Sequence, residues 1–404
     1  MSEDDGGLLI FPKAADAIEL RHLRAFVAVA EELNFGRAAA ALYVSQPALS
    51  RQIRALEQLM GCELLRRSTH RVELTLAGEA LLDRARRLLR DVDEAVTSVQ
   101  AMGGELVERA ARLWAPIEEV WGPSGDLERA RAAYEEMCTS FSPPEGVTVR
   151  SANASGVPAL VLTPPEVNGT SVLYLHGGGY VMGSAFGYQA LGGAVASYSR
   201  SETVVVEYRL APEHPYPAAV DDALTAYTWL ISRTPAERVT VMGDSCGGHL
   251  AMALLLRLRH EGLPLPGGAA LLCPFVDLTL EAPGPDVDPA HAVFIEHARL
   301  CTAAFLGAHP ADDPAHNAMY ADLTGLPPLL IQAGTADPVV QDANLLHDRA
   351  QAAGVESSLE LYPVETHVFH LFWDFLPEAM EGLRQAADFV REPAGTLDRT
   401  SIST

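Results

Sequence analysis

The sequence lacks the features of a secreted or membrane-bound protein. Its five cysteines are odd in number, scattered and nowhere in a Cys-x-x-Cys pair, which predicts reduced thiols in a cytoplasmic protein. The N-terminus, Met1-Ser-Glu-Asp-Asp5, is acidic where a signal peptide is basic, and no apolar run is long enough to cross a bilayer. We see no cluster of metal ligands, and regard the metal-like spacing of His367 and His370 as accidental, so we expect neither a metal nor a cofactor, and no membrane partner.

Positive charge is scarce overall and unevenly distributed. The net charge of the 404 residues is −24. Residues 18–90 hold twelve arginines against eight acidic residues, a balance of +4, which leaves −28 for the rest. A basic module joined to an acidic body predicts that only the N-terminal part meets a polyanion. With 48% hydrophobic residues, a chain of this length is expected to form two or three globular domains.

Helical periodicity begins at Ile18, after a loose tail over residues 1–17. A second short helix is expected over Gly36–Leu42. After a tight break, Ser45 can cap a third helix, and Pro47 is tolerated in its first turn. The apolar faces of the first and third helices are expected to be buried; they comprise Leu20, Leu23, Phe26, Val27, Ala30 and Leu33, and then Leu49, Ile53, Leu56 and Met60.

The opposite face of the third helix is polar. Gln46, Ser50 and Arg54 share it, with Arg51 beside them. Two helices joined by a short turn, the second carrying such side chains outward, form a helix-turn-helix that can enter a DNA major groove. The pattern alone also fits a helical hairpin with a solvated polar face. The segment Arg66–Thr75 reads as a small basic hairpin, or wing.

Residues 18–90 resemble the N-terminal winged helix-turn-helix domain of LysR-type transcription regulators. The resemblance rests on Leu20-Arg-His-Leu-Arg-Ala-Phe26, Phe35-Gly-Arg-Ala-Ala39, Val44-Ser-Gln-Pro-Ala-Leu-Ser-Arg-Gln-Ile53 and Leu74-Thr-Leu-Ala-Gly78. It implies a DNA-binding domain over residues 18–76 and a DNA partner. The candidate contacts are Phe35, Gly36, Arg37, Ser45, Gln46, Pro47, Ser50, Arg51, Arg54 and Arg71.

A long helix is expected over residues 77–102, ending at Gly103-Gly104. Its apolar residues repeat at spacings of four and three, as in a heptad seam: Leu81, Ala85, Leu88, Val92, Ala95 and Val99. The LysR resemblance implies that residues 78–100 form a homodimer or higher oligomer. From the seam alone, packing of this helix on its own domain is an equal alternative.

Beyond this helix the LysR pattern stops, and a helical region over residues 105–146 is interrupted at Trp121-Gly-Pro-Ser-Gly125. Residues 147–392 then alternate apolar, β-branched runs with helical stretches such as Ala218–Ile231 and Asn344–Ala353, which predicts a mostly parallel sheet with helices on both faces. Residues 393–404 are expected to be a disordered tail. The expected strands are Val147–Val149, Ala159–Leu162, Ser171–Leu175, Glu202–Glu207, Arg238–Met242, Ala269–Cys273, Pro328–Gln332 and Ser358–Tyr362.

One turn carries the chemistry of this second part. Ser245 stands between Gly243 and Gly247, where a strand runs into a helix, and a Gly-x-Ser-x-Gly turn of this kind lifts the serine hydroxyl clear of the sheet. Upstream, His176-Gly-Gly-Gly-Tyr180 follows a buried-type strand and can offer backbone amides to an oxyanion. The expected donors are the amides of Gly177, Gly178 and Cys246.

Residues 105–392 resemble the hormone-sensitive-lipase family of α/β-hydrolases. The resemblance rests on His176-Gly-Gly-Gly-Tyr180, Tyr208-Arg-Leu-Ala-Pro-Glu-His-Pro-Tyr-Pro-Ala218 and Gly243-Asp-Ser-Cys-Gly-Gly248. It implies an α/β-hydrolase fold with a small helical cap, and a substrate that is a short acyl or small aromatic ester. Cys246 departs from the alanine usual in the family. Its thiol, at a helix N-terminus, is either a reactive group or, as we expect, a small packed residue.

A serine nucleophile needs a base and an acid that orients the base. His367 follows the last strand, and the family pattern places the base before Val-Phe, which favours His367 over His370. Asp337 follows the preceding strand; Asp342, already helical, is expected to be a solvated carboxylate. The order Ser245, Asp337, His367 is that of α/β-hydrolases.

The sequence therefore predicts a multidomain protein: an all-α winged helix-turn-helix with a linker helix, followed by an α/β-hydrolase. Its expected function is that of a DNA-binding regulator fused to a serine carboxylic-ester hydrolase. Two alternatives stay open. The hydrolase fold could serve a regulator only as a ligand pocket, or the enzyme could carry a vestigial DNA-binding module.

Overall fold

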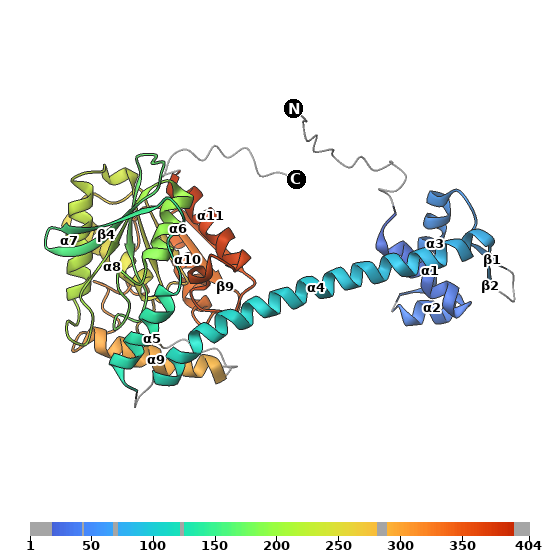
Figure 1. The fold of residues 1–404 in the computed structure, drawn as a ribbon, viewed down its shortest axis with the longest axis horizontal. Helices are drawn as coiled ribbons and strands as arrows, with labels where there is room; N and C mark the ends of the chain where they lie inside the picture. The colour runs from blue at the N-terminus through green and yellow to red at the C-terminus, as the bar shows by residue number, and fades with distance from the viewer. Residues whose placement is uncertain (1–17, 43, 68–71, 122–124, 281–288, 392–404) are drawn as a thin grey trace. The chain divides into compact units, whose positions relative to one another are not determined.

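The computed structural model describes residues 18–42, 44–67, 72–121, 125–280 and 289–391. The chain divides into two compact units, residues 1–104 and residues 105–404 (Figure 1). Each unit has its own hydrophobic core. Within the described residues, no helix is both long enough and apolar enough to cross a membrane.

Three helices form the body of the first unit: α1 (Leu20–Glu32), α2 (Phe35–Ala41) and α3 (Gln46–Met60). The Ser45 side chain accepts the Ala48 N–H and caps α3, with Pro47 in the first turn, as predicted. Most of the predicted apolar positions are buried, but three are wrong: Leu20, Leu33 and Met60 lie at helix ends and are 39%, 50% and 36% exposed.

A two-stranded antiparallel hairpin follows the three helices. It pairs β1 (Leu65–Arg67) with β2 (Val72–Leu74), so that Leu65 lies opposite Leu74. Leu65 is buried in the core of the unit, and Val72 and Leu74 pack against it. The hairpin is the wing expected from the sequence. Arg71, one of its candidate DNA contacts, lies outside the described residues.

The next helix, α4 (Leu76–Val120), corrects the prediction that Gly103-Gly104 ends the linker helix. Glycine within a helix costs about 1 kcal/mol relative to alanine but does not stop it, and a glycine stop needs a left-handed backbone. Gly104 has no positive φ and stays helical. Of the heptad positions, Leu81 and Ala85 pack in the core of the first unit and Leu88 is exposed; the side chains of Val92, Ala95 and Val99 lie outside the described residues.

The second unit is built on an eight-stranded sheet in the order β10-β9-β8-β7-β5-β6-β4-β3. Its strands pair in parallel except β3 with β4 and β4 with β6. Every strand overlaps a predicted one. Their bounds are β3 (Thr148–Ala154), β4 (Val157–Thr163), β5 (Ser171–Leu175), β6 (Glu202–Val206), β7 (Val239–Asp244), β8 (Gly268–Leu272), β9 (Leu329–Gly334) and β10 (Ser357–Tyr362).

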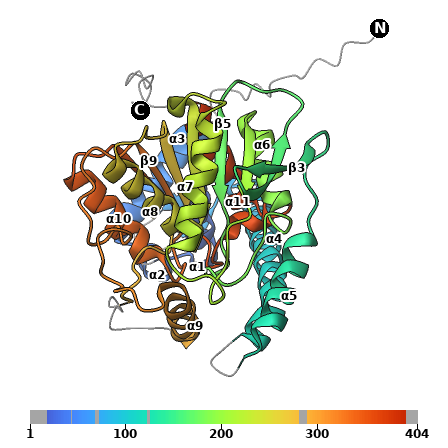
Figure 2. The same cartoon turned by 90° about the vertical axis from the view of Figure 1, so that its left-hand side faces the viewer.

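Helices cover both faces of this sheet (Figure 2). Helices α6 (Gln189–Ser199) and α11 (Pro377–Arg391) pack together on one face. The other face carries α7 (Ala218–Ile231), α8 (Cys246–Glu261) and α10 (Val340–Ala352). The remaining helices of the unit are the end of α4, α5 (Leu127–Thr139), α9 (Pro289–Leu306) and the short 3-10 turns η1 (Ala236–Arg238) and η2 (Phe369–Phe372).

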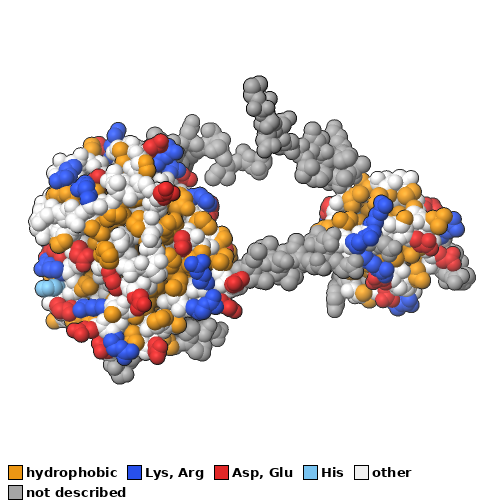
Figure 3. All heavy atoms as spheres, in the orientation of Figure 1, with side chains coloured by type: hydrophobic (Ala, Val, Ile, Leu, Met, Phe, Trp, Pro, Cys, Tyr) orange, Lys and Arg blue, Asp and Glu red, His pale blue; other side chains and the backbone are white. Residues whose placement is uncertain are grey.

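The surface of the second unit carries charges of both signs. On the face seen in Figure 3, acidic and basic side chains lie interspersed over this unit. The ion pairs at the surface of this unit include Arg150 with Glu202 and Arg384 with Glu381. On that face the negative charge of the chain is therefore not gathered into one patch.

Candidate active site and nucleic-acid face

Ser245 occupies a sharp turn between β7 and α8. Its backbone has φ 51° and ψ −122°, a left-handed conformation that is strained for a residue with a side chain. The flanking glycines are needed for space. A Cβ on Gly243 would lie 2.2 Å from the Gly247 carbonyl oxygen, and a Cβ on Gly247 would lie 2.0 Å from the Leu175 oxygen. The turn thus holds the serine at the carboxyl edge of the sheet.

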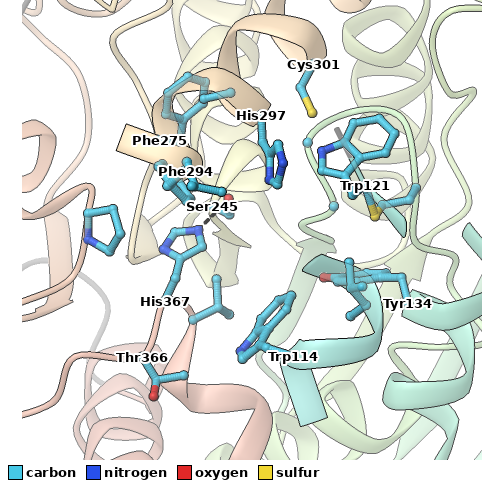
Figure 4. A pocket seen from close by; sticks show the side chains of 18 of the residues that line it. Trp114, Trp121, Tyr134, Ser245, Phe275, Phe294, His297, Cys301, Thr366 and His367 are labelled. Atoms are coloured by element: carbon cyan, nitrogen blue, oxygen red, sulfur yellow. Dashed lines mark hydrogen bonds between the residues drawn. The ribbon is translucent and has the colours of Figure 1, made fainter. Parts of the chain in front are cut away.

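His367 and Asp337 reach Ser245 from neighbouring strand ends. His367 Nε2 lies 2.9 Å from Ser245 Oγ, and His367 Nδ1 lies 2.9 Å from Asp337 Oδ1 (Figure 4). Asp337 follows β9 and its side chain is fully buried, while the His367 side chain, after β10, is 15% exposed. His370 is not part of this group, because it is buried and its Nε2 bonds Gln332 Oε1 at 3.0 Å.

Asp342 is not the solvated carboxylate that the sequence suggested. It lies in the first turn of α10, and one oxygen accepts the N–H groups of Val276 at 2.8 Å and Asp277 at 2.9 Å. Burial raises its pKa to about 7, and these two bonds act in the opposite direction. Asp342 therefore joins α10 to the loop after β8.

The glycine loop also departs from the prediction at one residue. The amide of Gly177 donates to Asp244 Oδ1 at 3.0 Å, so it does not face the serine. Gly178 and Gly179 both line the cavity that contains Ser245, and both have a positive φ, 109° and 61°. In the described residues neither amide has a recorded hydrogen-bond partner. The amide of Cys246 is the first of α8, where helix N–H groups have no partner within the helix.

The Cys246 thiol is a packed group. It is fully buried, and its sulfur accepts the Tyr180 N–H at 3.2 Å. Burial raises the pKa of this thiol well above its usual value, which outweighs any lowering by the helix N-terminus. A reactive thiolate at this position is therefore not favoured.

The fold brings a third group to the pair of Asp337 and His367. Cys273, after β8, places its sulfur so that ligand atoms of all three residues lie within 4.8 Å of one another. The sequence spacing does not predict this cluster, because its members come from three separate strand ends. Burial raises the pKa of the Cys273 thiol well above its usual range, so the metal-binding thiolate is disfavoured here.

A cavity of about 590 Å³ opens onto Ser245 and His367. Its size lies within the range of small-molecule sites. Trp114 and Trp121 come from the end of α4 and the segment after it, Tyr134 comes from α5, and Phe294 comes from α9 (Figure 4). The cavity wall is mostly apolar and aromatic. The residues predicted to form a cap over 105–146 therefore supply much of the wall around the serine.

In the first unit, the predicted DNA contacts on α3 are mostly exposed. Ser45, Gln46, Pro47, Arg51 and Arg54 are exposed and Ser50 is half-buried. Within the described ranges, Arg51 and Arg54 have no recorded acidic partner. Their guanidinium groups are thus available to an external anion.

The candidate contacts on α2 are placed differently. Phe35 packs against the core of the unit, which makes it a structural anchor for α2. Gly36 is exposed, and its N–H donates to Asn34 at 2.8 Å in the cap of α2. Arg37 Nε bonds Glu32 Oε2 at 2.7 Å, so this arginine is already engaged in an exposed ion pair.

Comparison with known protein families finds two matches at separate parts of the chain. Residues 20–79 match the lysR family of bacterial regulatory helix-turn-helix proteins. Residues 172–371 match the family described as alpha/beta hydrolase fold. The first match covers α1 to β2 and the start of α4, and the second contains Ser245, Asp337 and His367.

Similar proteins of known name are esterases. An acetyl-hydrolase of Streptomyces hygroscopicus is 36% identical over 284 residues, which cover 67% of this chain and 92% of that protein. The carboxylesterase/phospholipase LipF of Mycobacterium tuberculosis is 30% identical over 317 residues, or 74% of this chain and 84% of that protein.

A solved structure of an esterase from the bacterial hormone-sensitive lipase family is also similar. It superimposes with a TM-score of 0.65 and 33% sequence identity, covering 71% of this chain and 98% of the other. The sheet order, the serine turn and these similarities agree. The chain belongs to the hormone-sensitive-lipase family of α/β-hydrolase esterases, and it carries a LysR-family helix-turn-helix region ahead of the hydrolase fold.

Proposed function

We propose that this protein is a LysR-type DNA-binding regulator whose hydrolase part cleaves carboxylic esters with a Ser245–His367–Asp337 triad. The observation that carries the proposal is the unbroken run of contacts from Asp337 to His367 to Ser245, each 2.9 Å long, at the floor of an apolar cavity. In this reading DNA and a small ester are the partners. A homodimer through residues 78–100 and a cytoplasmic location, where the DNA is, complete the proposal.

The reaction begins with attack of Ser245 Oγ on the ester carbonyl carbon. His367 Nε2 takes the serine proton, while Asp337 accepts the Nδ1 hydrogen and stabilises the imidazolium. Collapse of the tetrahedral intermediate breaks the bond to the alcohol oxygen, which leaves with the proton from His367. Water then attacks the acyl-enzyme by the same route and releases the acid and free Ser245.

The amides of Gly178, Gly179 and Cys246 are the proposed donors to the oxyanion. The positive φ at both glycines and the partnerless first amide of α8 support this assignment. Gly179 replaces Gly177 in the predicted set, because the Gly177 amide is taken by Asp244.

Short acyl or small aromatic esters are the proposed substrates. A cavity of about 590 Å³ with aromatic walls suits a small apolar group next to the serine. The naming of one relative as an acetyl-hydrolase agrees with this size. Another similar structure, at 32% identity and a TM-score of 0.64, was soaked with p-nitrophenyl butyrate.

The test is hydrolysis of p-nitrophenyl esters of increasing chain length by the purified full chain and by Ser245→Ala. We expect activity on acetyl and butyryl esters, and a loss of about 10⁴-fold or more in Ser245→Ala, because the nucleophile is removed. Ser232→Ala is the matched control, since the Ser232 hydroxyl donates to the Trp229 carbonyl at the end of α7, away from the cavity. Activity that persists in Ser245→Ala would show that another group is the nucleophile.

A further inference from the structure

A buried chain of hydroxyl groups leads from the cavity wall to the residue before the serine. The hydroxyls of Tyr134, on α5, and Tyr188, before α6, lie 2.6 Å apart. The Tyr188 hydroxyl donates to Asp244 Oδ2 at 2.8 Å. Because a phenol has one hydrogen, the Tyr134 hydroxyl must be the donor to Tyr188. The order of donation is therefore Tyr134 to Tyr188 to Asp244.

Asp244 is fully buried and collects three donors. Besides Tyr188, it accepts the Tyr174 hydroxyl at 2.9 Å and the Gly177 amide at 3.0 Å, both on Oδ1. A buried carboxylate is stable only when such donors surround it. Burial raises its pKa to about 6, while the bonds from Tyr188, Tyr174 and Gly177 and the charge of His367 lower it. The ionised carboxylate thus depends on this set of donors.

The glycine loop rests directly on these groups. A Cβ on Gly177 would lie 2.2 Å from Asp244 Oδ2 and 2.9 Å from the Tyr188 hydroxyl. No atom separates the loop backbone from the carboxylate and the phenol. Since Gly178 and Gly179 follow at once in the chain, the position of Gly177 sets where their amides point.

Helix α5 holds the same loop at two further points. Arg131 Nε donates to the Val181 carbonyl at 2.7 Å, and its other nitrogens bond both oxygens of Glu213 at 2.8 Å. Ser184 donates to Glu135 at 2.8 Å. Residues 131, 134 and 135 lie on one side of α5, so that one helix supports the loop from residue 177 to residue 188.

We propose that Tyr188 is a positioning residue for ester hydrolysis: held by Tyr134, it fixes Asp244 and Gly177 so that the Gly178 and Gly179 amides face the oxyanion. The inference rests on the proposed function, since it concerns the same reaction. Tyr188 contacts neither the cavity nor Ser245; it acts only through the carboxylate and the loop.

The test compares Tyr188→Phe and Tyr134→Phe with Tyr227→Phe in the full chain. Tyr227 is the matched control because it is also fully buried and its hydroxyl makes one bond, to the Pro264 carbonyl at 2.9 Å, away from the cavity. Each variant loses one hydroxyl and keeps its ring. The readouts are kcat and KM for p-nitrophenyl butyrate, affinity for n-butylboronic acid, which imitates the tetrahedral intermediate, and the melting temperature.

For Tyr188→Phe we expect kcat to fall about tenfold to a hundredfold with KM within about twofold, because misplaced amides weaken binding of the transition state alone. Boronic acid affinity falls by about the same factor. Tyr134→Phe gives a smaller loss, and the double variant equals Tyr188→Phe, because both act through one chain of bonds. The acid limb of kcat/KM moves to higher pH in Tyr188→Phe, since Asp244 loses a donor that lowers its pKa.

The inference is overturned if Tyr188→Phe keeps wild-type kcat and boronic acid affinity. It is also overturned if Tyr188→Phe and Tyr227→Phe lose the same amount of kcat and boronic acid affinity for each degree by which their melting temperatures fall. If Tyr188→Phe fails to fold, the smaller change in Tyr134→Phe decides by the same kcat and KM split. Failure of the proposed triad gives a different result, because Ser245→Ala then stays active. If only the role of Tyr188 is wrong, wild type is active, Ser245→Ala is inactive and Tyr188→Phe has the activity of wild type.

Discussion

Asp342 and its two backbone donors make the stability of the hydrolase unit depend on pH. With a pKa of about 7 in the fold against an ordinary value of 3.8, the carboxyl binds a proton more readily folded than unfolded. Between about pH 4 and pH 7 the folded chain therefore holds more protons at this site, and the unfolding free energy falls as pH rises. Above about pH 7 Asp342 is ionised in the folded chain as well, so the unfolding free energy no longer falls because of this group.

We predict that Asp342→Asn removes this penalty. An amide oxygen still accepts the Val276 and Asp277 N–H groups without a charge. The variant should match wild type near pH 3 and exceed it by up to about 4 kcal/mol at pH 8, because the folded pKa of about 7 lies about three units above the ordinary value. Thermal unfolding across this pH range measures the difference. Asp348→Asn, at an exposed position of the same helix, is the control; equal pH dependence in wild type and Asp342→Asn would contradict the argument.

Single residues show what the sequence can and cannot predict, and the catalytic roles of Ser245, Asp337 and His367 stay a prediction. Ser245, Asp337 and His367 were chosen from turn type and strand ends, and the fold brings them within hydrogen-bond distance. The glycine run predicted an amide loop but not which amides face the serine. That choice depends on Asp244, which takes the Gly177 amide, and no local pattern shows that a residue 67 positions away will do so.

At the scale of elements, helix α3 presents a face suited to DNA. Gln46, Ser50 and Arg54 recur every four residues, while Leu49, Ile53 and Leu56 are fully buried on the other side. We predict that Arg54→Ala weakens DNA binding. If Arg54 contacts phosphate, the salt slope of binding falls by about 1; if it reads a base, discrimination at one position falls by about 1–3 kcal/mol.

A gel-shift titration over a range of salt, with DNA from upstream of the protein's own gene, measures this effect. Arg86→Ala is the control, since Arg86, on α4, is paired with Glu31 through bonds of 3.1 and 2.8 Å. Equal affinity and slope for Arg54→Ala and wild type would show that this face does not meet DNA.

Element ends were harder to predict than element cores. Apolar runs predict the position of each strand, because a buried strand needs them. The predicted bounds of strand β5, Ser171–Leu175, and of helix α7, Ala218–Ile231, agree with the structure. Helix ends depend on smaller free-energy differences, such as the cost of a glycine within the helix. Gly103-Gly104 reads as a stop, yet α4 continues through it to Val120, where Gly122 and Pro123 follow. A helix whose two ends pack in cores tolerates a glycine cost of about 1 kcal/mol.

At the scale of the whole molecule, one helix, α4, has residues in both compact units. Near its start, Ala85 is buried in the core of the helix-turn-helix unit. Near its end, Val107, Ala111 and Trp114 line the cavity that contains Ser245. A group bound in that cavity therefore contacts a helix that also has residues in the first unit.

We predict that filling the cavity changes DNA affinity. Phenylmethylsulfonyl fluoride forms a covalent bond with a reactive serine and places its aromatic ring in the cavity. Treated wild type should bind DNA about fivefold or more differently from untreated protein, a typical size for coupling between sites. Ser245→Ala, which cannot react, should bind DNA equally with and without the reagent.

Two substitutions at one position test whether α4 carries the effect. A Cβ at Gly104 meets no atom within 4 Å, so Gly104→Ala keeps the helix and should keep the dependence on the reagent. Gly104→Pro kinks or breaks the helix at that residue, because proline lacks the N–H and clashes with the preceding turn. This variant should lose the dependence on the reagent while ester hydrolysis continues. If reagent-treated and untreated wild type bind DNA equally, the two activities are independent. If Gly104→Pro retains the change, the signal travels by another path, such as contacts between two copies of the chain.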